Sequence, residues 1–155
     1  MMIILETLLK LFDRDLQRLE DEINLYTTDE SLWIVSGEIK NSSGNLCLHL
    51  CGNLQHYIGK NLGHTSYVRD RDNEFAVKGL SKADVIAEVQ RTKTVVRETL
   101  ETLKPSVLDA EYPERIFDFP TTTAYFLIHL TTHLGYHLGQ INYHRRILAV
   151  PSPVM

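Results

Sequence analysis

Four of the seven histidines in the chain lie in one stretch near the C-terminus, "HLTTHLGYHLGQINYHRR", residues 129–146. His129, His133 and His137 follow one another at intervals of four residues. On a helix this spacing places successive imidazoles on one broad face. Neutral imidazole is a common metal ligand, and two histidines in an H-x-x-x-H pattern can bind one ion. The stretch therefore indicates either one wall of a metal site or a helix that buries histidines in its core.

A second polar group surrounds His49 in "NSSGNLCLHLCGNLQHYIG", residues 41–59. If this stretch is helical, Asn45, Gly52 and Asn53 lie within about 60° of His49, whereas most of the apolar residues lie on the other side. His49 could thus supply a third nitrogen from a facing helix. A site with three histidine ligands keeps a coordination position open for water or substrate.

The spacing alone does not decide between a metal site and a metal-free bundle with buried, hydrogen-bonded histidines. A buried imidazole needs a partner in either case, because an unpaired buried polar group costs about 1–3 kcal/mol. Position 134 is Leu, so the general base of the H-E-x-x-H protease motif is missing. The E-x-x-H pattern of di-iron bundles is missing as well.

Helical periodicity comes in four blocks, at about residues 3–27, 43–62, 81–104 and 121–148. Ser81 with Asp84 resembles a capping box, Thr121 or Thr122 can cap the last block, and "PSPVM" should end it. With 155 residues and 43% hydrophobic side chains, the chain suits one domain that covers residues 1–155. We therefore expect an all-α four-helix bundle.

The predicted connections, residues 28–42, 63–80 and 104–120, are long for a simple bundle. At least one of them should cross between parallel neighbouring helices. "SLWIVSGEI" and "ERIFDF" within these connections could form short strands or lids at an end of the bundle.

Charge and composition argue against two classes of partner. Twenty acidic and sixteen basic residues give a net charge of -4, with no basic cluster of the kind that binds nucleic acid. The apolar start of the chain is interrupted by Glu6 and Lys10, so it resembles an amphipathic helix and not a signal peptide or a membrane span. Cys47 and Cys51 are interpreted as small core residues with reduced thiols, as in a cytoplasmic protein.

The two histidine stretches, in a chain of this length with four helical blocks, resemble the DinB/YfiT-like superfamily of metalloenzymes. Its members are four-helix bundles with one histidine on the second helix and two, four apart, on the last. The resemblance implies a metal triad of His49, His133 and His137. It also implies an up-down-down-up order with a crossover between the second and third helices, and a homodimer. Zinc or nickel would be the ion, with iron, manganese or cobalt as alternatives.

Several members of this superfamily are thiol S-transferases that use bacillithiol or mycothiol, and one branch is a mycothiol-dependent maleylpyruvate isomerase. The resemblance therefore implies a metal-dependent transferase that activates a low-molecular-weight thiol, or water in a hydrolase, for attack on an electrophile. The alternative is a non-catalytic metal-binding or small-molecule-binding module, or a stress-associated structural dimer. No Ser-His-Asp or Cys-His nucleophile is evident, so no catalytic side chain is assigned.

Four further residues are predicted to line the pocket or to support the ligands. His129 should form the pocket wall, because one ion cannot easily take ligands spread over two helical turns. Gln140 and Asn53 could orient a ligand imidazole or a bound water. Arg69, in the expected crossover, could bind a carboxylate of an anionic thiol.

Other polar and aromatic residues are given structural roles. His56 and His144 should face the interior too far along the bundle to join the triad, and His64 should be solvated. Trp33 is expected to anchor its loop on the core. Three tyrosines are expected to be core aromatics: Tyr57, Tyr136 and Tyr143.

Overall fold

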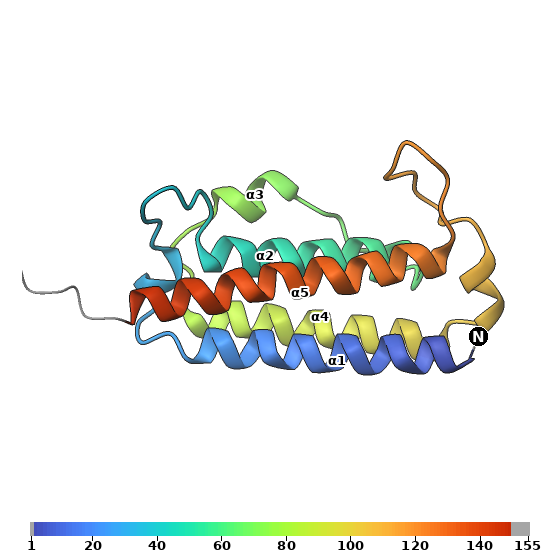
Figure 1. Ribbon diagram of the computed structural model, residues 1–155, viewed down its shortest axis with the longest axis horizontal. Helices are drawn as coiled ribbons and strands as arrows, with labels where there is room; N and C mark the ends of the chain where they lie inside the picture. Colours follow the sequence, from blue (N-terminus) through green and yellow to red (C-terminus); the bar gives the residue numbers. More distant parts are fainter. Residues whose placement is uncertain (1, 150–155) are drawn as a thin grey trace, which may run out of the picture.

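The computed structural model describes residues 2–149, and the predicted helix stop in "PSPVM" lies outside that range. The described part is all-α and contains no strand, which confirms the predicted fold class (Figure 1). It has four long helices, α1 Met2–Asn24, α2 Ser43–Leu54, α4 Lys82–Thr102 and α5 Thr123–Leu148. Shorter pieces join them: the 3-10 helices η1 Glu30–Trp33 and η3 Pro105–Asp109, the π-helix η2 Gln55–Lys60, and α3 Arg71–Ala76.

Both α1 and α2 pack against α4 and α5, which makes a four-helix bundle. In Figure 1, α1 and α5 run in one direction, and α2 and α4 run in the other. The chain therefore returns along the bundle between the end of η2 and the start of α4. The segment that makes this crossover carries α3, which lies on the outside of α2.

The ends of the helices follow from side-chain caps. Ser42 accepts a hydrogen bond from the backbone of Asn45 and caps α2. Ser81 and Asp84 form the predicted capping box of α4, and Thr122 caps α5. Such caps satisfy backbone N–H groups that have no partner in the first helical turn.

The buried core residues lie on the apolar faces of the predicted helices. Helix α2 is buried nearly all round, and within it only Leu48 is partly exposed. Cys47 and Cys51 are buried free thiols in this core, as predicted. The largest fully buried side chains come from α1, α2 and α5 and from the short elements η1, η2 and η3. They include Phe12, Leu16, Leu19, Leu32, Leu50, Leu54, Leu108, Phe126 and Leu130.

The short strands considered for "SLWIVSGEI" and "ERIFDF" do not form. The first stretch contains η1 and an irregular turn, and the second is an irregular loop beside a single bridge between Glu111 and Thr122. Trp33 holds the first connection in place, because its Nε1 donates to the carbonyl of Leu80 at 3.0 Å. The indole also lies against Gly44, where a Cβ would be only 2.7 Å from it. Trp33 is thus the predicted anchor.

Among residues 2–149, no helix is long and apolar enough to cross a membrane.

Candidate metal centre

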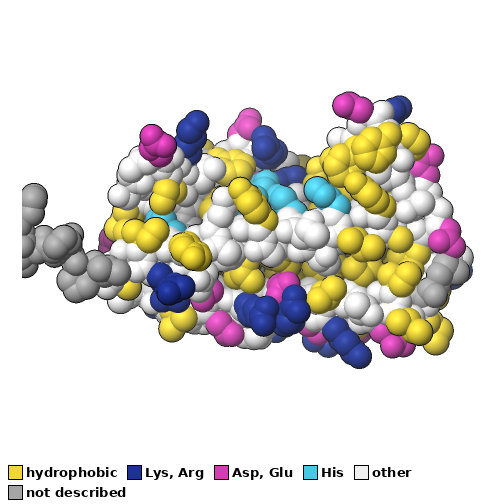
Figure 2. Space-filling view, in the orientation of Figure 1, with side chains coloured by type: hydrophobic (Ala, Val, Ile, Leu, Met, Phe, Trp, Pro, Cys, Tyr) yellow, Lys and Arg dark blue, Asp and Glu magenta, His cyan; other side chains and the backbone are white. Residues whose placement is uncertain are grey.

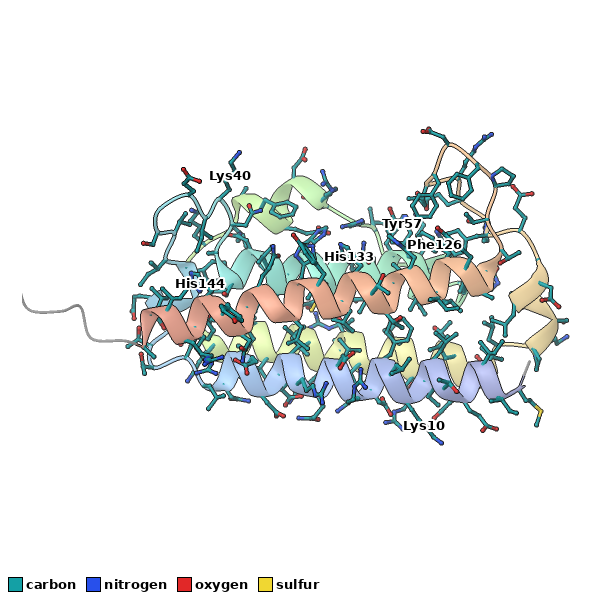
Figure 3. All side chains as sticks on the ribbon, in the orientation of Figure 1. Lys10, Lys40, Tyr57, Phe126, His133 and His144 are labelled. Atoms are coloured by element: carbon teal, nitrogen blue, oxygen red, sulfur yellow. The ribbon has the colours of Figure 1, made fainter. Side chains whose placement is uncertain are left out.

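The structure brings His49 of α2 together with His133 and His137 of α5. One ring nitrogen from each of the three histidines lies within 4.8 Å of the other two, a spacing that could hold a metal ion. The ring centroids of His49 are 5.3 Å from His133 and 5.4 Å from His137. Figure 3 places His133 about midway along the bundle, where α5 faces α2. In Figure 2, histidine side chains reach the surface in a hollow between α3 and the loop before α5.

The ring of His49 is held by a carboxylate from the crossover. Its Nδ1 lies 3.0 Å from Glu74 Oε2, and the Arg69 guanidinium donates to both oxygens of Glu74, at 2.7 and 2.9 Å. A carboxylate that accepts from Nδ1–H fixes the histidine tautomer and leaves Nε2 with its lone pair for an ion. Burial raises the pKa of Glu74, but hydrogen bonds from His49 and Arg69 outweigh it and hold that pKa below its ordinary value.

Gly52 allows this carboxylate to reach His49. A Cβ at Gly52 would lie 2.0 Å from Glu74 Oε1, so any larger residue would displace the side chain of Glu74. Asn45 also fastens α3 to α2, because its Nδ2 donates to the carbonyls of Glu74 and Val77 at 3.0 and 2.8 Å. The polar, small-residue face of α2 is therefore where the crossover docks.

The second ligand candidate, His137, is oriented within its own helix. Its Nδ1 lies 2.7 Å from Gln140 Oε1, so Gln140 is positioned to orient this imidazole. Because the amide oxygen can only accept, Nδ1 carries the proton and Nε2 is the nitrogen with the free lone pair. Burial lowers the pKa of His137, which favours the neutral, ligating form of the ring.

His133 provides a test of whether this donor set fits a metal ion. Its Nδ1 is buried and has no hydrogen-bond partner among residues 2–149. Burial, together with the neighbouring histidines His137 and His49, lowers the pKa of His133 to about 4. A buried polar atom without a partner is uncommon in folded proteins. A neutral histidine with such an atom beside two prepared Nε2 atoms fits the ligation of an ion.

Of the other predicted pocket residues, His129 lies close to the triad without joining it, and Asn53 is buried on α2. His129 lies against Phe117, with ring centroids 5.1 Å apart, and its ring centroid is 6.3 Å from that of His133. It thus lies beside the triad, in an aromatic cluster with Phe117 and Phe126. Asn53 is buried, and its Oδ1 has no hydrogen-bond partner in the described part of the chain.

Arg69 has a different role from the one predicted. Its Nε and one Nη donate to Glu74, and that Nη lies 3.3 Å from His49 Nδ1. Its guanidinium is therefore engaged inside the protein and does not project as an open site for a substrate carboxylate. The reason is Glu74, whose buried charge needs a partner.

The remaining histidines lie apart from the triad, as predicted. His144 is buried, and its Nδ1 lies 2.8 Å from the Tyr26 hydroxyl. His56 Nε2 lies 2.7 Å from Glu114, and His64 is exposed.

The prediction that Tyr136 and Tyr143 are core residues is wrong, because they are 65% and 68% exposed. Tyr57 is partly buried and packs on the core.

Glu74 is the residue that the sequence did not reveal. It lies in "YVRDRDNEF", which has the composition of a solvated, charged loop. The available signal was Asp70, which caps the short helix α3 and accepts from the backbone of Asn73. An N-cap followed by "RDNEFA" could have indicated a helix in the crossover, although not the face on which it docks.

Comparison with known proteins agrees with this fold. The model of a family described as the DinB superfamily matches residues 11–141. A solved structure, titled a conserved protein of locus from Enterococcus faecalis, is similar with a TM-score of 0.75. The alignment has 16% sequence identity and covers 92% of this chain and 95% of that one. At this identity it supports the fold alone. No curated protein matches the chain. Because the family match spans most of the sequence and includes all three histidines, the chain belongs to the DinB superfamily.

Proposed function

We propose that the protein is a metal-dependent transferase that activates a low-molecular-weight thiol, or water, for attack on an electrophile. The observation that carries this proposal is the convergence of three imidazole nitrogens within 4.8 Å of one another. Two of the three rings are held by a hydrogen bond at Nδ1, which prepares Nε2 as the ligand atom. Three protein ligands leave a position open, as in reactive sites and unlike closed structural ones.

The ion, when bound, would act as a Lewis acid that lowers the pKa of a coordinated thiol or water. The residues of the chain hold the site for that chemistry. Glu74 and Gln140 fix the tautomers of His49 and His137. Arg69 neutralises the buried charge of Glu74, and burial keeps His133 neutral.

The ligand set favours zinc or nickel, because three neutral imidazoles suit borderline metal ions. Iron, manganese and cobalt would also accept these nitrogens. Magnesium and calcium are disfavoured, since they prefer oxygen ligands. Elemental analysis of protein purified without a histidine tag identifies the metal and its stoichiometry.

A matched pair of variants tests the site. His133→Ala should abolish metal loading, whereas His129→Ala, one turn earlier on the same face of α5, should leave it unchanged. His64→Ala, at an exposed position, is a second control. Absence of a stoichiometric transition metal from wild-type protein, or equal loss of metal in all three variants, would refute the metal site.

An activity assay separates an enzyme from a binding module. Holo and metal-stripped protein are compared with a panel of thiols and the electrophile monochlorobimane. We expect thiol consumption above background only in the holo protein. Background rates for both forms with every thiol would favour a non-catalytic module. The expected homodimer and cytoplasmic location stay predictions, and sedimentation velocity tests the first of them.

A further inference from the structure

A separate pocket lies directly beside the triad, between the connection that precedes α2 and the C-terminal half of α5. Its volume is about 480 Å³, within the range of small-molecule sites. His137 and Gln140 form part of its wall. The other lining residues come from the connection, from the start of α2 and from α5: Glu38, Ile39, Lys40, Asn41, Leu46, Tyr136, Tyr143, His144 and Ile147.

Hydrogen bonds hold the two sides of the pocket, which are a turn in the connection before α2 and the surface of α5 around His144. The connection turns at Gly37, which has φ of +60°, and Ile39 N–H donates to the carbonyl of Ser36 at 3.2 Å. On the α5 side, His144 Nε2 lies 3.0 Å from the carbonyl of Ile34. The Ser43 hydroxyl lies 2.9 Å from Nδ1 of the same histidine. These bonds tie the connection to α5 and α2, so the pocket is formed in the free protein.

Three polar groups at the pocket are available to a ligand. Lys40 and Glu38 are exposed residues of the connection that line the cavity, and neither side chain makes a hydrogen bond or an ion pair with residues 2–149. Gln140 uses its amide oxygen on His137, so its amide NH₂ is left to donate. The pocket therefore offers donors for an anion and one acceptor for a cation.

The same pocket also explains an unusual surface. Tyr136, Tyr143 and Ile147 are more than half exposed, yet all three lie along one side of α5 and line this cavity. Clustered exposed apolar side chains around a concave site indicate ligand binding more often than scattered ones do. The two aromatic rings provide flat surfaces for an apolar group.

We propose that this pocket binds a small zwitterionic molecule of the amino-acid class, with an apolar or aromatic side chain. Lys40 and the Gln140 amide bind its carboxylate, and Glu38 binds its ammonium group. The side chain lies on Tyr136 and Tyr143. Since Gln140 occupies Nδ1 of His137, the ligand lies next to the Nδ1 edge of this ring, while Nε2 serves the triad.

The pocket would thus hold the part of a substrate that is remote from the reacting atoms. That role rests on the proposed function, although binding itself does not require the metal. Substrate binding at such a remote position can supply free energy for orienting the reacting group.

Binding is tested by NMR titration of the metal-stripped and the metal-loaded protein with three probes. Phenylalanine carries both charges, N-acetylphenylalanine keeps only the carboxylate, and phenylalaninamide keeps only the ammonium group. Phenylalanine should bind most tightly and shift the side-chain amide signals of Gln140. Lys40→Gln should weaken binding of the two carboxylate probes about two- to fivefold, and Glu38→Gln should do the same for the two ammonium probes.

Two further variants define the site. Tyr143→Ala should weaken all three probes about three- to tenfold, because the aromatic contact does not depend on charge. Lys10→Gln is the matched control, since Lys10 is an exposed lysine on α1, on the far side of the bundle from Lys40 (Figure 3). Lys10→Gln should leave every affinity unchanged.

The proposal is overturned if phenylalanine fails to bind either form of the protein. It is also overturned if the Lys40, Glu38 and Lys10 variants bind the probes alike. Phenylalanine binding of the predicted pattern without metal loading would refute the proposed function but keep the pocket. Metal-dependent thiol activity without this binding pattern would support the proposed function and refute the pocket proposal.

Discussion

Replacing Glu74 with Gln is the sharpest test of how the chain prepares its metal ligands. The substitution keeps the shape of the side chain and an oxygen that can accept from His49 Nδ1. It removes the negative charge that attracts that proton and that pairs with Arg69, whose side chain is only 11% exposed. The tautomer of His49 is then less firmly fixed, and Arg69 has no carboxylate partner in its buried position.

The expected loss of metal affinity is about 10- to 100-fold, the usual effect of removing the hydrogen-bond partner of a ligand histidine. This corresponds to about 1.4–2.7 kcal/mol of binding free energy. The assay is competition between metal-stripped protein and a chromophoric chelator, with zinc and nickel in turn. Circular dichroism and thermal unfolding of each variant establish that the bundle is intact.

Glu114→Gln is the matched control. Glu114 also bonds a histidine, His56, at 2.7 Å, but this pair is not part of the triad. Its loss should leave metal affinity unchanged. If Glu74→Gln binds metal as tightly as the wild type, or if Glu114→Gln loses the same affinity, then Glu74 does not prepare His49 and the reasoning fails.

Four other variants extend the test to packing and protonation. Gly52→Ala should lower metal affinity as Glu74→Gln does, because the new methyl would lie 2.0 Å from Glu74 Oε1; wild-type affinity in this variant would contradict the docking of Glu74 on α2. Burial lowers the pKa of His144 from 6.5, so below about pH 6.5 the unfolded chain binds a proton there more readily than the folded protein. The free energy of unfolding of metal-stripped protein, measured by urea titration, should therefore decrease from pH 7 to pH 5. His144→Gln should make that decrease smaller. An equal decrease in the wild type and the variant would show that His144 does not contribute. Leu16→Ala, at a fully buried position, should reduce the free energy of unfolding by about 2–5 kcal/mol, whereas Leu25→Ala at an exposed position should change it by less than about 0.5 kcal/mol.

The long helices could be predicted because their apolar periodicity records which face is buried. Ser81 with Asp84 and the threonine before α5 marked the starts of two helices, since their side chains satisfy the first backbone N–H groups. The helical faces predicted the triad only in part, because His129 shares the face of α5 with His133 and His137, and the resemblance to the superfamily selected the pair that joins His49. His133 and His137 share one face of α5, and His49 is central to the polar face of α2, so a packed bundle could bring them together.

The crossover could not be predicted in the same way. Helix α3 has only six residues, too few to show a periodic pattern, and its position depends on contacts with α2 that are distant in sequence. The exposure of Tyr136 and Tyr143 was missed because helical spacing gives relative directions on α5 and does not tell how much of its circumference is covered.

These two limits share a physical cause that bears on the function. The sequence shows that α2 has a polar face, but that face meets two partners: α5, which supplies two histidines, and α3, which supplies Glu74. His49 lies where they meet, with Nδ1 on Glu74 and its ring beside those of His133 and His137. Docking of the crossover therefore sets the tautomer of a candidate metal ligand. A change that loosens α3 from α2 should weaken metal binding without touching any of the three histidines. In this bundle the ligand site is completed by the connection and not by the four long helices alone.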